Sequence, residues 1–174
     1  MSSSTQKSMP AGIGFLSVIE HAELGLFGGY LLLNTAGRPL EFHCTAPVRP
    51  NRAQEILYGP TLRPFLFGEQ IGQALLSKAK IPPILICCDS EPLLAAREFS
   101  ESPLVWVLEN KDEAPSGRAF RLGKNWSVAA STHTGDDALA NEAWKPYAEH
   151  FDLREPFSRI REALEEAQKS ARAA

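Results

Sequence analysis

The fold is decided by the stretch Pro83-Ile84-Leu85-Ile86-Cys87-Cys88-Asp89-Ser90. Its apolar residues run without interruption over the length of a strand and then give way to a charge, which is typical of a central strand that is covered on both faces. We therefore expect Asp89 to stand at the carboxyl end of that strand, where open α/β sheets bind their ligands. The stretch predicts both a fold and a candidate site.

Composition limits the class of protein and its surroundings. The 174 residues are 44% hydrophobic, which is enough for one sizeable core but leaves no room for a second domain. A net charge of -3 gives no general attraction for a nucleic acid backbone, so the net charge does not support nucleic acid as a partner. Three cysteines, two of them adjacent in an apolar run, predict reduced thiols and a cytoplasmic protein. We expect no membrane contact, because no apolar run reaches the roughly 18 residues that span a bilayer.

The first third of the chain predicts a three-stranded antiparallel meander. Residues 1–10 are polar and without periodicity, which indicates a disordered lead-in. Apolar and alternating runs then predict three strands, at 15–19, 30–33 and 40–45. The segment 34–38 has turn residues and hairpin length, so the second and third strands should pair antiparallel. Gly28 and Gly29 indicate a bend or a close backbone approach.

The middle of the chain predicts helices and strands in alternation. Asn51 can cap a first helix with Ala53, Ile56 and Leu57 on one face. Prolines at 60 and 64 then predict a break before a second helix. Beyond the central strand the pattern predicts, in order, a helix over 92–99, a parallel strand over 104–108, a polar loop over 111–117, one or two short strands within 120–130 and a helix capped by 134–136.

The C-terminal segment predicts a helix with a narrow apolar stripe. Within 156–172, apolar residues recur at spacings of three and four. Such a stripe either lies on the chain's own domain or meets a partner helix, and we assign to a protein partner the residues Phe157, Ile160, Leu164 and Ala167. The chain then divides into the lead-in, an α/β domain over 11–150 and a C-terminal helix over 151–174. The sequence leaves open whether the chain forms a homo-oligomer.

The order of these elements resembles the ribonuclease H-like fold, an α/β fold in which a three-stranded antiparallel meander is followed by helix, strand, helix and strand. The resemblance covers residues 15–108. Local segments are similar to those of the family: Gly28-Gly29-Tyr30 opens the second strand, Gly37-Arg38 lies in the hairpin, Asn51-Arg52-Ala53 enters the first helix and Asp89-Ser90 follows the fourth strand. The resemblance implies that the first and fourth strands lie side by side and parallel.

The resemblance also implies a cluster of carboxylates that holds two divalent metals, Mg or Mn, for the hydrolysis of a nucleic acid. The catalytic candidates are Asp89, Glu20, Glu55 and Asp137, with Asp89, Glu20 and Glu55 as metal ligands and His133 close upstream of Asp137. The chain departs from the family at two of these positions. Glu20 replaces an aspartate, and the helix acid of the family falls on Gln54, which lies about 100° around the helix from Glu55.

The incomplete acid set and the negative net charge favour a non-catalytic or degenerate ribonuclease H-like domain. It would act as an accessory or scaffold subunit through protein contacts, without a cofactor. The alternative is a divalent-metal nuclease. A third reading is a profilin-like or longin-like interaction domain without nuclease ancestry, which a parallel pairing of the first and fourth strands excludes. Separate salt bridges for Glu20 and Asp89 would exclude both the nuclease ancestry and the metal pocket.

The candidate residues also have purely structural alternatives. Asp89 and Ser90 can cap the helix over 92–99, and the glutamates can be ordinary solvated acids. Cys87 and Cys88 have no cationic neighbour in the sequence to lower a thiol pKa, so we expect them to pack in the core. The same expectation holds for the three tryptophans, Trp106, Trp126 and Trp144.

Overall fold

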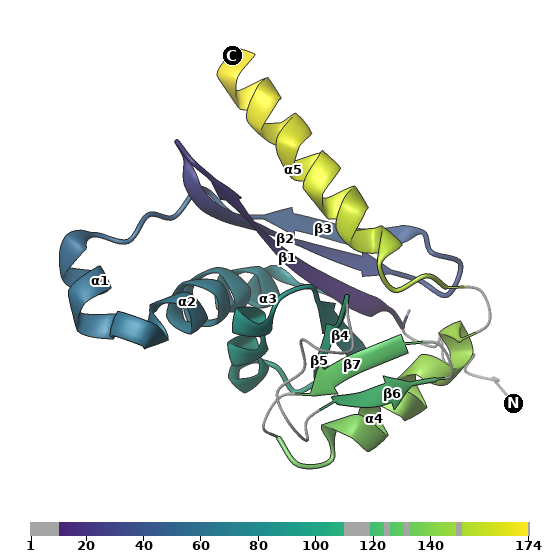
Figure 1. Cartoon of the computed structure of the whole chain (residues 1–174). Helices are drawn as coiled ribbons and strands as arrows, with labels where there is room; N and C mark the ends of the chain where they lie inside the picture. Colours follow the sequence, from purple (N-terminus) through teal and green to yellow (C-terminus); the bar gives the residue numbers. More distant parts are fainter. Residues whose placement is uncertain (1–10, 110–118, 124–125, 131–132, 149–150, 174) are drawn as a thin grey trace, which may run out of the picture.

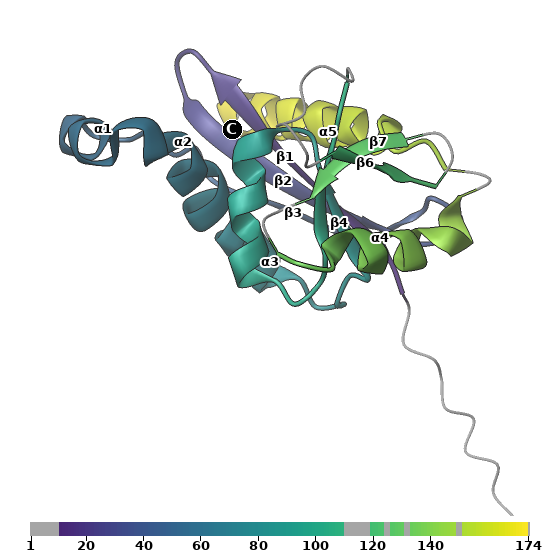
Figure 2. The same cartoon turned by 60° about the horizontal axis from the view of Figure 1, so that its bottom comes forward.

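The computed structural model describes residues 11–109, 119–123, 126–130, 133–148 and 151–173. Two predictions, the lead-in over 1–10 and the polar loop over 111–117, lie outside these residues. The described part is built on one seven-stranded sheet with the order β3-β2-β1-β4-β5-β7-β6. Helices cover both faces of this sheet (Figures 1 and 2).

The first three strands form the predicted meander. β1 (Ile13–His21) pairs antiparallel with β2 (Gly25–Leu33), which pairs antiparallel with β3 (Pro39–Cys44). Asn34 fixes the turn between β2 and β3, because its Oδ1 accepts hydrogen bonds from the backbone N–H groups of residues 36 and 38 at 2.9 and 3.0 Å. Gly37 in this turn has a φ of +74°, which is the left-handed region that favours glycine.

The next strands extend the sheet as the fold class requires. β4 (Leu85–Cys88) lies parallel to β1 and to β5 (Leu104–Val107). The connection between β4 and β5 contains η3 (Glu91–Phe99), a 3-10 helix at the place of the helix predicted over 92–99. β5 pairs antiparallel with β7 (Trp126–Ala130), which pairs antiparallel with β6 (Ala119–Leu122). The predicted order of a meander followed by parallel strands is confirmed.

The segment between β3 and β4 is helical and contains, in order, α1 (Arg52–Tyr58), η1 (Gly59–Thr61), α2 (Leu62–Pro64), η2 (Phe65–Gly72) and α3 (Gln73–Lys78). The predicted break falls at η1, where Pro60 follows a Gly59 with a φ of +50°. Pro64 does not break the second helix, because it lies in the first turn, where its missing N–H is not needed. The face of α1 that carries Ala53, Ile56 and Leu57 is not part of the core, since no residue of α1 is buried.

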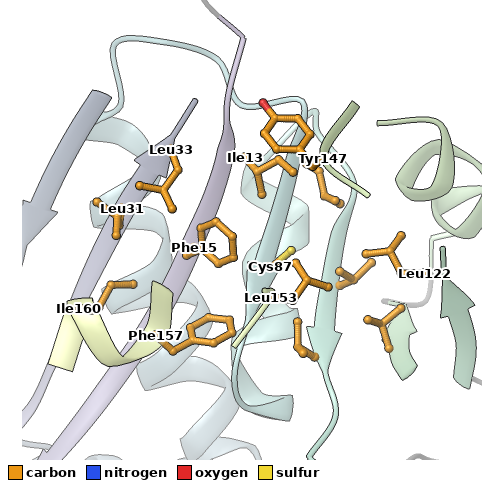
Figure 3. Packing of buried hydrophobic residues seen from close by; sticks show 14 of the residues in the cluster. Ile13, Phe15, Leu31, Leu33, Cys87, Leu122, Tyr147, Leu153, Phe157 and Ile160 are labelled. Atoms are coloured by element: carbon orange, nitrogen blue, oxygen red, sulfur yellow. The ribbon is translucent and has the colours of Figure 1, made fainter. Parts of the chain in front are cut away.

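The remaining helices are α4 (Asp136–Trp144), η5 (Lys145–Tyr147) and α5 (Glu155–Ala173). The apolar stripe of α5 lies on the sheet: Phe157, Ile160 and Leu164 are at most 4% exposed, and the Phe157 ring meets the ring of Phe15 in β1 edge to face at 5.5 Å (Figure 3). These three side chains therefore pack in the chain's own core instead of facing a partner, whereas Ala167 is exposed. None of the described helices is long and apolar enough to cross a membrane.

Two hydrophobic clusters share the sheet, one on each face. Alternation along β1 sends Ile13 and Phe15 to the cluster under α5, and Leu16 to the cluster under η2 and α3. β4 alternates in the same way, with Cys87 in the first cluster and Cys88 in the second. The central strand is therefore covered on both faces, as its apolar run predicts.

Gly28 and Gly29 in β2 let helices approach the sheet closely from both sides. A Cβ atom on Gly28 would lie 2.4 Å from Cγ2 of Ile71 in η2, and one on Gly29 would lie 2.6 Å from Cγ2 of Ile160 in α5. Such separations are too short for carbon atoms, so a methyl group at either position would push a helix away from the sheet. The expected close backbone approach is confirmed.

We expect Gly28→Ala and Gly29→Ala each to lower the free energy of unfolding by about 1–3 kcal/mol, because both overpack a buried helix contact. Urea unfolding measures the change. Ser158→Ala, on the exposed face of α5, is the control and should change stability little. Unchanged stability in both glycine variants would contradict the proposed packing of η2 and α5 on β2.

Candidate functional site

Asp89 directly follows β4 and lies on the face of the sheet that α5 covers. β1 and β4 are aligned with Leu16 beside Cys88, so the next pair along the two strands is Ser17 and Asp89. The hydroxyl of Ser17 donates a 2.7 Å hydrogen bond to Oδ2 of Asp89, and Ser17 is fully buried. The parallel pairing is confirmed, but it brings a serine to Asp89 where the resemblance implies a carboxylate.

Arg161 of α5 supplies the charge that balances Asp89. Its Nη2 donates to the same Oδ2 at 2.9 Å, and the exposed fraction of the side chain is 52% for Arg161 and 14% for Asp89. The helix fixes the position of Arg161, because the neighbouring Ile160 is buried against the sheet. The contact joins a nearly buried carboxylate to a guanidinium that reaches in from the surface.

Burial raises the pKa of the Asp89 carboxyl above 3.8, and the hydrogen bond from Ser17 and the charge of Arg161 offset this effect only in part. A carboxyl with a raised pKa binds its proton more tightly in the folded chain than in the unfolded chain. Its contribution to stability is therefore present at low pH and is lost as the pH rises through the folded pKa.

Glu20 lies on the opposite face of the sheet from Asp89. Side chains alternate along β1, so Glu20 and Ser17, three residues apart, point to opposite faces and are separated by about 10 Å of strand. Oε2 of Glu20 is 3.8 Å from Nη1 of Arg63 in α2, and the Glu20 side chain is 71% exposed. The two acids form separate ion pairs on opposite faces, so the expectation that they meet at one edge of the sheet is wrong.

Glu55 lines a groove together with Glu20, and Asp89 is not part of the lining. The groove has a volume of about 350 Å³, and its lining also includes Arg49 and Arg63. Glu55 accepts a 3.2 Å hydrogen bond from Nη1 of Arg52, which precedes it by one turn of α1. Each of these two glutamates is therefore paired with an arginine of the chain. Glu55 does not lie beside Asp89, where its predicted role as a metal ligand would place it.

The fourth candidate, Asp137, is exposed in the first turn of α4. Its neighbour Asp136 is buried, with 1% exposed, and accepts two hydrogen bonds from Arg97 of η3 at 2.8 and 3.1 Å. His133 is also exposed. The acid that α4 buries is therefore Asp136, and it ties α4 to η3 through Arg97 instead of contributing to a cluster with Asp89.

These residues do not fit the two-metal site that the resemblance implies. Oδ2 of Asp89 already accepts hydrogen bonds from a guanidinium and a hydroxyl, and Ser17 brings no charge. Within the described ranges, no group of three or more histidine, cysteine, aspartate and glutamate side chains could hold a metal ion. Two-metal hydrolysis needs several converging carboxylates, and the described part of this edge does not offer them.

The structure also tests the purely structural roles predicted for Asp89, Ser90, the two adjacent cysteines and the tryptophans. Ser90 stands at the N-cap of η3 but makes no side-chain capping hydrogen bond, and Asp89 is engaged elsewhere. Cys87 and Cys88 are fully buried, and burial raises the pKa of both thiols, which suits core residues and not nucleophiles. Trp106 and Trp144 are buried as expected, whereas the side chain of Trp126 lies outside the described residues.

The sequence pattern does not single out Ser17 or Arg161. Ser17 can be found only from the register of β1 and β4, because a buried serine within an apolar run carries no signal of its own. Arg161 adjoins the apolar stripe of α5, but the sequence does not show over which strands that stripe lies. Both residues belong to contacts between segments 72 residues apart.

Comparisons with known proteins bear on the fold. No family model and no curated protein matches the chain. A crystal structure of human ENDOV is 14% identical with a TM-score of 0.53, and the match covers 93% of this chain and 86% of that chain. A structure of Ciona intestinalis endonuclease V in complex with an inosine-containing DNA is 12% identical with a TM-score of 0.46, over 78% and 76% of the two chains. The likeness to human ENDOV shows the fold alone, which is ribonuclease H-like.

We expect Asp89→Asn to remove a pH-dependent loss of stability. In the wild type, the stability contribution of Asp89 falls as the pH rises from about 3.8 through the raised pKa, and asparagine does not titrate. Urea unfolding between pH 3 and 7 measures this, and the free energy of unfolding of the variant minus that of the wild type should increase with pH. A difference that decreases with pH would contradict the raised pKa.

Arg161→Met should destabilise the chain at neutral pH, because it leaves the Asp89 carboxylate with Ser17 alone. We expect a loss of about 1–2 kcal/mol, which is modest because Arg161 is half exposed. The loss should shrink at low pH, where Asp89 is protonated. Lys169→Met, on the exposed face of the same helix, is the matched control. Equal effects of the two substitutions would argue against the ion pair.

Proposed function

We propose that this chain is a degenerate ribonuclease H-like domain that acts as an accessory or scaffold subunit through protein contacts and does not cleave nucleic acid. The observation that carries the proposal is the 2.9 Å contact between Arg161 and Asp89 at the carboxyl end of the central strand. A guanidinium keeps its charge at all physiological pH values. It therefore supplies Asp89 with a permanent positive charge from the chain itself.

The environment of Asp89 supports this proposal. A divalent cation at Asp89 would have to displace Arg161 or lie beside it, and the second position is opposed by repulsion between like charges. The remaining groups within reach offer little compensation, because Ser17 is neutral and Glu20 is on the other face of the sheet. The chain nevertheless keeps a complete sheet and two packed clusters, which suits a domain that serves as a structural platform.

The second candidate function is a divalent-metal nuclease that uses Glu20, Glu55, Asp89 and Asp137. One observation favours it: Asp89, with 14% of its side chain exposed, follows β4 beside the parallel strand β1, in a fold shared with human ENDOV. This function would require Glu20 and Glu55 to leave their arginine partners and cross to the other face of the sheet. The accessory role requires no such rearrangement.

The test is thermal melting of the full chain with MgCl₂, MnCl₂ or NaCl at matched ionic strength. A metal at 100 times its dissociation constant would add about 2.7 kcal/mol of stability. We expect no stabilisation that depends on Asp89, so the wild type and Asp89→Asn should respond alike. Cleavage assays under the same conditions, with single-stranded and duplex DNA and RNA and with inosine-containing DNA, should show no product.

Stabilisation by Mn²⁺ or Mg²⁺ that disappears in Asp89→Asn, together with cleavage that disappears in the same variant, would favour the nuclease. Glu166→Gln is the internal control, because Glu166 is exposed on α5 and is none of the four candidate acids. Cleavage that survives Asp89→Asn would point to a contaminating nuclease.

A further inference from the structure

The helix α1 carries an apolar face that the described chain does not cover. Ala53, Ile56, Leu57 and Pro60 recur at the spacing of one helical face, and Ile56 and Leu57 are 64% and 82% exposed. Figures 1 and 2 both show α1 standing out from the body, at the end remote from α4 and β6. A seven-residue helix gains little stability by itself, so an uncovered face of this kind calls for a contact.

The arm formed by α1, η1 and α2 is held in one orientation. Asn51 and Gln54 form a reciprocal capping box at the start of α1, with hydrogen bonds of 2.8 and 3.0 Å. At the other end, the rings of Tyr58 and Phe65 are stacked with centroids 4.1 Å apart. A side chain presented on a fixed arm loses little conformational freedom on binding, which favours association.

A groove of about 550 Å³ is lined by the end of the arm and by η3, and its apolar lining includes Pro64 of the arm together with Pro92 and Leu94. Volumes of this size are usual for binding clefts. The arginines in its lining are already engaged: Arg97 holds Asp136, and Arg63 lies over the ring of Phe67 at 4.7 Å.

The charges of this groove that remain available are acidic. Glu91 and Glu98 are exposed at its edge, and neither has an ion-pair partner among the described residues. The arm has the opposite character, because α1, η1 and α2 contain two arginines and one glutamate in a chain whose net charge is -3. The arm and the groove are therefore complementary both in charge and in apolar surface.

We propose that a second copy of this chain covers α1. The arm of each copy inserts Ile56 and Leu57 into the groove of the other. Arg52, whose side chain is 81% exposed although it contacts Glu55 at 3.2 Å, turns toward Glu91 and Glu98. Because the arm and the groove adjoin on one chain, a single two-fold axis lets both arms fill both grooves, which closes the assembly as a dimer. This inference does not depend on the proposed accessory function.

Sedimentation equilibrium of the full chain tests the proposal. We expect a mass of about twice 19.1 kDa at concentrations near 100 µM. Leu57→Asp should give a monomer at the same concentration, with an unchanged far-ultraviolet circular dichroism spectrum, because Leu57 is exposed and does not support the core. Leu139→Asp is the matched control: Leu139 is 53% exposed on α4, and the variant should remain a dimer.

Charge-reversal substitutions test whether this groove is the surface that the arm of the other copy contacts. Arg52→Glu alone, and Glu91→Arg with Glu98→Arg, should each weaken dimerisation about tenfold or more through repulsion between like charges. The three substitutions together should restore most of the affinity, because the complementary pairs are rebuilt with reversed signs. Failure of this restoration would overturn the assignment of the groove.

Three other results would overturn the proposal. One is a wild-type chain that stays monomeric throughout the tested range, and another is a dimer that Leu57→Asp leaves intact. The third is a monomer that binds phosphatidylserine vesicles or single-stranded DNA through Leu57, which would reassign the arm to that ligand. The metal and cleavage assays are independent of all these outcomes, so failure of the dimer and failure of the accessory function can be told apart.

Discussion

The parallel register of β1 and β4 is the constraint on which the site depends. It places Ser17 beside Asp89, and the alternation of side chains directs both to the face that α5 covers. The same alternation sends Glu20 to the other face, toward Arg63. Once this register is formed, the first strand cannot offer Glu20 to Asp89, and the position opposite Asp89 belongs to a neutral side chain.

Arg161 then links the site to the packing of the C-terminal helix. Burial of Phe157, Ile160 and Leu164 fixes α5 on the sheet, and Arg161 reaches Asp89 from the exposed side of that helix. One ion pair thus joins a helix to the carboxyl end of the central strand. The carboxylate at the end of the central strand thus serves the packing of the chain.

The sequence predicts the strands and their order well, because apolar runs, the turn at Asn34 and the long run before Asp89 are local signals. It fails where the outcome depends on which side chains face each other across strands. The register of β1 and β4 separates Glu20 from Asp89 and places Ser17 beside Asp89. A pattern within one segment of the sequence does not predict this register. The helix capped by Asn51 is found as predicted, but its helical period does not show whether the apolar face is buried.

The most direct measurement of the central claim is a crystal structure of the chain grown with MnCl₂, with anomalous differences collected for manganese. The account predicts no manganese peak at Asp89, with Nη2 of Arg161 and Oγ of Ser17 at hydrogen-bonding distance from its carboxylate. A manganese ion bound to Asp89, with Arg161 turned toward solvent and a second carboxylate on the metal, would contradict it.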